Sequence, residues 1–172
     1  MIQPIRAQFK PTPSDYVKAT LAFYFTQRSI LVLTAVSILF FIMAVPYSLV
    51  QWARGSNIAI FILAIALGFI LIAAATVVAP LMRVRKVVDQ NETMRAETVW
   101  SITNDRMELR NRFEKTDLEW ELFDCLIDTR QYFLLVYAGN KRQFTFLPKH
   151  AFSSADECER FKRMANENLA NR

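Results

Sequence analysis

The chain has 172 residues and a formal charge of +5 at pH 7; 53% of its residues are hydrophobic, 13% are aromatic and only 3 are glycine. This composition excludes an intrinsically disordered or collagen-like chain. It also excludes a glycine-rich phosphate-binding loop, because Gly55, Gly68 and Gly139 lie far apart.

The positive charge is concentrated in the first half of the chain. Residues 1–88 carry eight Lys and Arg against one acid, whereas residues 89–172 carry thirteen against fifteen. The basic excess therefore flanks the apolar segments, as the positive-inside rule describes. A nucleic-acid-binding protein would carry it on the folded domain. We expect the lipid bilayer as a partner and no nucleic acid.

Residues 1–28 are predicted to form an N-terminal strand and an interfacial helix. Ile2–Phe9 has strand character but is too short to be stable alone, so it is expected to add an edge strand to the sheet of the C-terminal part. Ser14 is the predicted cap of a helical segment over Asp15–Gln27. The tyrosine and phenylalanine side chains of that segment suit the headgroup region of a bilayer.

Two uncharged apolar runs follow, at Ser29–Val50 and Ile58–Met82. Each is longer than the roughly 18 residues that indicate a membrane-spanning helix. The link 51–57 is so short that the two helices must form an antiparallel hairpin. Because this link holds only Arg54 while basic residues flank the outer ends of both runs, we expect 51–57 to be extracytoplasmic and both termini cytoplasmic. A cleaved signal peptide fits poorly, since 28 residues precede the first run and a second run follows.

Neither run contains an ionisable side chain, and two helices cannot enclose a pore. Transport is therefore disfavoured unless several copies assemble, and a homo-oligomer stays open. Four hydroxyl groups within the two runs are predicted to hydrogen-bond back into their own helices. They belong to Thr34, Ser37, Ser48 and Thr76.

Beyond Met82 the hydrophobic period changes to two. The alternation in Arg106–Phe113 and in Asp117–Leu122 predicts half-buried strands of an antiparallel sheet. The residues expected to point inward are Met107, Leu109, Phe113, Leu118, Trp120 and Leu122.

Two hairpins are predicted in this part. The first joins Glu97–Thr103 to the strand that starts at Arg106, through Asn104-Asp105. The second joins Tyr132–Ala138 to Arg142–Leu147 through a glycine-containing turn, and Pro148 ends its last strand. For Phe123–Arg130, a further strand and a bent connection both stay open.

The chain closes with a predicted amphipathic helix. Ser153 or Ser154 is expected to cap it, with Asp156 or Glu157 as the reciprocal partner of a capping box. Residues 83–172 thus predict a small antiparallel β domain, PH-like in outline, closed by a C-terminal α-helix. The expected fold class is an α+β membrane protein, in which a two-helix transmembrane hairpin precedes a cytoplasmic domain.

Several short motifs together carry a family resemblance. They are Asp15-Tyr16, Ser101-Ile102-Thr103, Trp120, Tyr132-Phe133-Leu134-Leu135 and the segment from Leu147 to Ser154. With them the chain resembles the YcxB-like proteins of bacteria, and the last motif is the most specific. The resemblance implies two transmembrane helices and a C-terminal YcxB-like domain in a bacterial inner membrane. It implies no reaction, cofactor or catalytic residue.

The residues with catalytic chemistry do not form a recognisable constellation. Glu119 and Glu121 share one face of the predicted strand, which is expected to be solvated. His150 has no nucleophile context in the sequence and is expected to face solvent from a loop. The two cysteines, Cys125 and Cys158, have no metal-ligand spacing with it. We therefore expect no enzyme, no catalytic residue, no cofactor and no metal.

Two functions from different classes remain. The first is a binding module whose cytoplasmic domain docks a protein partner of unknown identity, in a regulatory, adaptor or immunity-type role. The second is a sensor of anionic lipid headgroups at the inner leaflet. The expected headgroup contacts are Arg83, Arg85, Lys86, Arg110 and Arg112.

Overall fold

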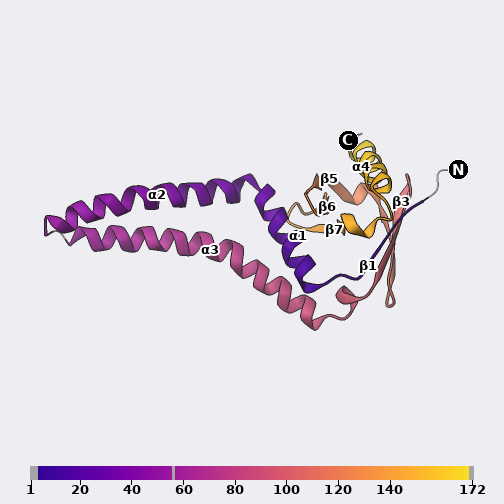
Figure 1. The fold of residues 1–172 in the computed structure, drawn as a ribbon, viewed down its shortest axis with the longest axis horizontal. Helices are drawn as coiled ribbons and strands as arrows, with labels where there is room; N and C mark the ends of the chain where they lie inside the picture. Colours follow the sequence, from indigo (N-terminus) through magenta and orange to yellow (C-terminus); the bar gives the residue numbers. More distant parts are fainter. Residues whose placement is uncertain (1–3, 56, 171–172) are drawn as a thin grey trace. The chain divides into compact units, whose positions relative to one another are not determined.

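A computed structural model describes residues 4–55 and 57–170 of the chain (Figure 1). In these residues the fold is α+β, with four α-helices and two antiparallel sheets. The chain divides into two compact units. One, the helical unit, is Thr20–Val84; the other, the β unit, combines Met1–Ala19 with Arg85–Arg172.

The helical unit contains the end of α1 (Pro13–Thr26), then α2 (Arg28–Ala53) and most of α3 (Ile58–Gln90). Both α2 and α3 are long and apolar enough to cross a membrane. Their mutual contact uses small side chains, and Phe40 of α2 lies 5.4 Å from Phe69 of α3 between ring centroids. The residues buried in α2 and in the first part of α3 are Ser37, Ala44, Ser48, Ala59 and Ala66. Small side chains therefore occupy these buried positions of the two helices.

Four hydroxyl groups of these helices bond within their own helix, as predicted. Thr34 Oγ1 donates to Ile30 O at 2.8 Å, and Ser37 Oγ donates to Leu33 O at 2.8 Å. Ser48 and Thr76 bond in the same way to carbonyls three residues earlier. Their polar groups are thus satisfied without water.

The β unit contains a four-stranded and a three-stranded antiparallel sheet (Figure 1). The first sheet has the order β1-β2-β3-β4, formed by Ile5–Phe9, Thr98–Ile102, Arg106–Arg110 and Lys115–Glu119. The second has the order β5-β6-β7, formed by Phe123–Asp128, Tyr132–Tyr137 and Phe144–Pro148. Helix α4 (Ala155–Ala170) follows, and single 3₁₀ turns cover Thr93–Arg95, Trp120–Leu122 and Lys149–Ala151.

Strand β1 is the edge strand expected from the N-terminal segment, over Ile5–Phe9. It pairs antiparallel with β2, so that Ala7 lies opposite Trp100. Its buried side chains, Ile5, Ala7 and Phe9, alternate with exposed ones. Residues 2 and 3 of the predicted strand lie outside the described residues.

The core of the β unit is rich in aromatic rings. Phe161 of α4 lies 5.1 Å from Phe133 of β6, 5.4 Å from Phe152 and 6.4 Å from Trp120 between ring centroids. Phe161 and Phe133 are almost completely buried. Helix α4 begins at the predicted capping box, in which Ser154 Oγ accepts the Glu157 N–H and Glu157 Oε2 accepts the Ser153 N–H.

Three local predictions are corrected. Phe113 and Leu122 do not point inward but are 47% and 44% exposed. Strand β3 ends at Arg110 because the Asn111 side chain accepts the N–H groups of Phe113 and Glu114 and starts a turn. Strand β4 ends at Glu119 because the chain enters a 3₁₀ turn over Trp120–Leu122, which rotates Leu122 out of the alternation.

The third correction concerns the cap of α1, which is Thr12 and not Ser14. Thr12 Oγ1 accepts the Asp15 N–H, and Asp15 Oδ2 accepts the Thr12 N–H at 3.0 Å. Pro13 then occupies the first helical position, where a missing N–H costs nothing. The segment Phe123–Arg130, which had two interpretations, forms strand β5 up to Asp128 and then a turn.

Candidate functional site

The five basic residues predicted to contact headgroups are all exposed. Arg83, Arg85 and Lys86 lie on α3, and Arg110 is the last residue of β3. Arg112 lines a hollow of the β unit. We name this the Arg112 hollow, of about 510 Å³, whose charged lining residues are Lys10, Glu92, Arg95, Glu97 and Arg112.

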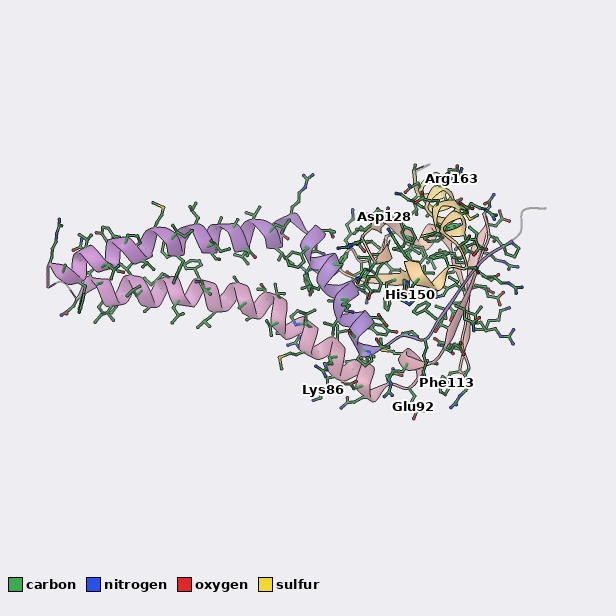
Figure 2. The ribbon with its side chains drawn as sticks, in the orientation of Figure 1. Lys86, Glu92, Phe113, Asp128, His150 and Arg163 are labelled. Carbon is green, nitrogen blue, oxygen red and sulfur yellow. The ribbon has the colours of Figure 1, made fainter. Side chains whose placement is uncertain are left out.

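The Arg112 hollow combines cations with an exposed aromatic ring. The Arg112 guanidinium carbon lies 4.7 Å from the centroid of the Phe113 ring, in cation–π geometry. Figure 2 shows Glu92 and Phe113 close together in this part of the β unit, and both line the hollow. Glu97 accepts a hydrogen bond from Gln8 Nε2 at 2.8 Å. The carboxylates of Glu92 and Glu97 offset most of the charge of the three cations that line the hollow.

A second and larger hollow lies beside β4, the strand at one edge of the four-stranded sheet. Its volume is about 1050 Å³, and we name it the acidic hollow. Its lining includes four carboxylates and one guanidinium, from Asp105, Asp117, Glu119, Glu121 and Arg106. Leu122 and Trp120 add an apolar margin. Within the described residues, no strand pairs with the outer edge of β4.

A third hollow, of about 350 Å³, brings together family-motif residues that are far apart in sequence. We name it the Tyr132 hollow; it is lined by Asp15, Lys18, Arg130, Gln131, Tyr132, Lys149 and His150. At its centre the Tyr132 hydroxyl donates to Asp15 Oδ1 at 3.1 Å, across 117 positions of sequence. His150, labelled in Figure 2, is exposed as predicted.

Neighbouring contacts hold Asp15-Tyr16 against the β unit. The Tyr16 hydroxyl donates to Met94 O at 3.0 Å, and the Tyr16 ring packs edge-on against Phe146 at 4.9 Å. Tyr132 packs edge-on against the same ring at 5.7 Å. Sequence reasoning identified Asp15, Tyr16 and Tyr132 as motif residues, but no local signal indicates that they meet.

The titration of the central pair follows from these bonds. Burial opposes the ionisation of Asp15, but hydrogen bonds from Thr12 and Tyr132 and the nearby His150 outweigh it, so its pKa is lowered. Burial and the Asp15 carboxylate raise the pKa of Tyr132 to about 12. At neutral pH, therefore, a neutral tyrosine donates to an ionised carboxylate.

Lys149 is held by an ion pair next to this hollow. Its Nζ lies 2.5 Å from Asp128 Oδ1, and Lys162 of α4 binds the other oxygen at 2.7 Å. Burial opposes the ionisation of Asp128, but the bonds from Lys149 and Lys162 outweigh it and lower its pKa. Lys149 Nζ also lies 4.8 Å from the centre of the Phe133 ring. These contacts fix one side of the Tyr132 hollow.

The part of the chain that the structure describes contains no group of three His, Cys, Asp or Glu placed to hold a metal ion. Cys125 and Cys158 are free thiols. Burial is the main reason that the pKa of each thiol is raised. Both cysteines are therefore largely protonated at neutral pH and are weak nucleophiles.

The fold defines the class of protein: a small α+β unit of two antiparallel sheets and a closing helix, in a chain that also carries two helices apolar enough to span a membrane. Residues 102–165, from the end of β2 to the middle of α4, match the family model described as YcxB-like protein. This match confirms, for that segment, the resemblance to the YcxB-like family that was drawn from the motifs. Searches of curated proteins and of solved structures found no match.

Proposed function

We propose that the protein is a non-catalytic, membrane-anchored binding module of a bacterial inner membrane. In this proposal α2 and α3 cross the bilayer as a hairpin, and both termini and the PH-like β unit lie in the cytoplasm. The exposed apolar surface of α2 and α3 and the basic residues at their outer ends support this arrangement. Four strands, three strands and a closing helix support the PH-like outline.

The observation that carries the binding function is the free edge of β4 beside the acidic hollow. An edge strand presents unpaired backbone N–H and C=O groups that can accept another strand. Alternate residues of β4, Lys115, Asp117 and Glu119, are exposed, and the last two line the hollow. We therefore propose an extended, basic segment of a cytoplasmic or membrane protein as the ligand.

The test is crosslinking in cells of the tagged, membrane-embedded chain, with a photoreactive residue at Leu122, followed by mass spectrometry. We expect one protein in near-equal amount with the chain. The double variant Asp117→Lys, Glu119→Lys should reduce its recovery at least tenfold. The matched control Glu159→Lys changes an exposed carboxylate of α4 outside the hollow and should have little effect. Recovery of the same protein at equal yield from the double variant would contradict the proposed site.

The proposed topology has an internal reporter. Cys125 is exposed on the β unit. A membrane-impermeant maleimide should label Cys125 in inverted vesicles but not in intact spheroplasts. A cysteine at Asn57→Cys, in a variant with both native cysteines changed to serine, should give the opposite pattern. Labelling of Cys125 in intact spheroplasts would overturn the orientation.

A second candidate function, sensing of anionic headgroups, is supported by the Arg112 hollow. Arginine and an exposed phenylalanine are a combination that suits the bilayer interface. The discriminating experiment compares Arg112→Glu with Arg110→Glu in nanodiscs that contain phosphatidylglycerol, with native mass spectrometry of retained lipid. Arg112 lines the hollow and Arg110 does not, so the first variant should lose the lipid and the second should keep most of it. Unchanged retention in both variants would rule out this candidate.

A further inference from the structure

We propose that the Tyr132 hollow is an anion site that binds a phosphomonoester group. The group can be carried by a soluble compound or by the headgroup of phosphatidic acid, and the two sources share the same chemistry. The site is separate from the acidic hollow, so it does not depend on the proposed protein partner.

The first argument is an excess of positive charge in the hollow. Lys18, Arg130, Lys149 and His150 contribute basic groups, against the single carboxylate of Asp15. Among the described residues, neither Lys18 nor Arg130 has an ion-pair partner. Both side chains are exposed. Two full positive charges thus face a concave surface without a counterion from the protein.

The Asp15 carboxylate does not cancel these charges directly, because its oxygens are engaged elsewhere. Asp15 Oδ2 accepts the N–H of Thr12 at 3.0 Å and its hydroxyl at 2.7 Å. Asp15 Oδ1 accepts the Tyr132 hydroxyl. The carboxylate therefore caps α1 and holds the Tyr132 side chain in the lining of the hollow. Lys149 is likewise occupied by Asp128, so Lys18 and Arg130 are the cations available to a ligand.

The second argument is that the backbone holds the basic residues in place. Arg130 and Gln131 form the β5–β6 turn, in which Thr129 Oγ1 donates to Tyr132 O at 2.7 Å and accepts the Tyr132 N–H at 3.0 Å. Lys149 N donates to Gln131 O at 2.9 Å, which joins the 3₁₀ turn to that hairpin. Three elements, namely α1, the β5–β6 turn and the 3₁₀ turn, therefore converge before any ligand arrives. A site arranged in advance loses less entropy on binding.

The third argument is the fit between this hollow and a phosphomonoester. Such a group carries about −1.5 to −2 charges at pH 7 and several acceptor oxygens, which suits an arginine and a lysine that have no partner. A volume of about 350 Å³ lies at the lower end of small-molecule sites. The Arg112 hollow is the less favourable anion site, because Glu92 and Glu97 line it together with its cations.

The experiment uses the full chain in nanodiscs. Soluble probes, inorganic phosphate and glycerol 3-phosphate, are titrated by calorimetry against nanodiscs of phosphatidylcholine alone. The lipid source is tested by native mass spectrometry of nanodiscs that contain phosphatidic acid. We compare the double variant Lys18→Gln, Arg130→Gln with the control double variant Arg142→Gln, Arg163→Gln, which removes the same charge from exposed positions outside the Tyr132 hollow.

We expect saturable binding of at least one probe, weakened about tenfold or more in the first double variant, since hydrogen bonds to charged groups contribute that much each. The control should stay within about twofold, because screened surface charges contribute little at a distance. Saturation by glycerol 3-phosphate assigns a soluble ligand; retention of phosphatidic acid alone assigns the lipid. Either result supports the site. Absence of saturable binding to the wild-type chain, or an equal loss in the control, overturns it. Neither result bears on the protein partner proposed for β4, whose recovery is measured separately.

Discussion

The helical unit and the β unit use apolar side chains in opposite ways. In α2 and the part of α3 that belongs to the helical unit, most large apolar residues are outside, for example Met43 at 67% and Phe61 at 68% exposure. In the β unit the corresponding residues are inside, for example Phe133 at 1% and Phe161 at 0%. The buried positions of α2 and the following part of α3 are instead alanine and serine. The proposed bilayer would account for this difference, because large apolar side chains that face hydrocarbon do not need to be buried inside the protein.

The polar groups differ in the same manner. Four hydroxyl groups of α2 and α3 each bond to a carbonyl three or four residues earlier in the same helix. In the β unit, Tyr132 reaches Asp15 across 117 positions and Tyr16 reaches Met94 across 78. Exposure of an apolar side chain therefore means something different in each unit, and mutations can test this directly.

The largest expected effect is a cavity in the core of the β unit. Phe133→Ala removes a buried ring that contacts Phe152 and Phe161, and should reduce the free energy of unfolding by about 3–5 kcal/mol. Phe113→Ala, which truncates an exposed ring, should change it by less than about 0.5 kcal/mol. Urea unfolding in detergent, followed by tryptophan fluorescence, measures both. Equal losses would place Phe113 in the core.

The next prediction compares an exposed apolar residue of α3 with an exposed apolar residue of the β unit. Ile65 of α3 is 54% exposed and Leu122 of the β unit is 44% exposed. Ile65→Lys should cost about 2.5–3.5 kcal/mol in membrane insertion, if the exposed surface of α3 faces hydrocarbon. Leu122→Lys should alter stability by less than about 0.5 kcal/mol. The inserted fraction is measured by carbonate extraction of membranes. Full insertion of the lysine variant at Ile65 would contradict the membrane assignment of α3.

A smaller effect with a defined pH dependence is expected at Asp15. Asp15→Asn weakens the cap of α1 and the bond from Tyr132, and should lower the free energy of unfolding by about 1–2 kcal/mol at pH 7. The folded-state pKa of Asp15 lies below its ordinary value of 3.8. The stabilisation is therefore complete above that value and is lost as the pH falls through the lower, folded-state pKa.

Denaturant unfolding between pH 3 and 7 measures the Asp15 effect, with Asp117→Asn as the control for an exposed carboxylate. The difference between wild type and Asp15→Asn should shrink on acidification. A difference that is constant over this range would show that the ionised carboxylate has no part in the stabilisation.

The smallest effect tests the cap of α4 with adjacent serines. Ser154 Oγ accepts the Glu157 N–H, whereas Ser153 contributes only its backbone N–H to the Glu157 side chain. Ser154→Ala should cost about 1 kcal/mol of unfolding free energy, and Ser153→Ala should cost a few tenths at most. The same unfolding assay distinguishes them. A reversed order would move the helix start by one residue.

Features that depend on neighbouring residues were predictable from the sequence. The two apolar helices, the hairpins at Asn104-Asp105 and near Gly139, and the capping box at Ser154 follow from composition and turn chemistry within a few positions. The errors at Phe113 and Leu122 have one cause. Period-two alternation was extended past the point where Asn111 and a 3₁₀ turn end the strands, and these interruptions leave little mark on the alternation.

The sequence by itself determined which segments are apolar, where they turn and which motifs the YcxB-like segment carries, because each is a local property of the chain. The tertiary structure alone decided that β1 pairs with β2, that Asp15 meets Tyr132, and that Lys18, Arg130 and His150 line one hollow. Such meetings depend on the packing of elements that lie far apart in the sequence. No local propensity encodes which of the available polar groups that packing brings together.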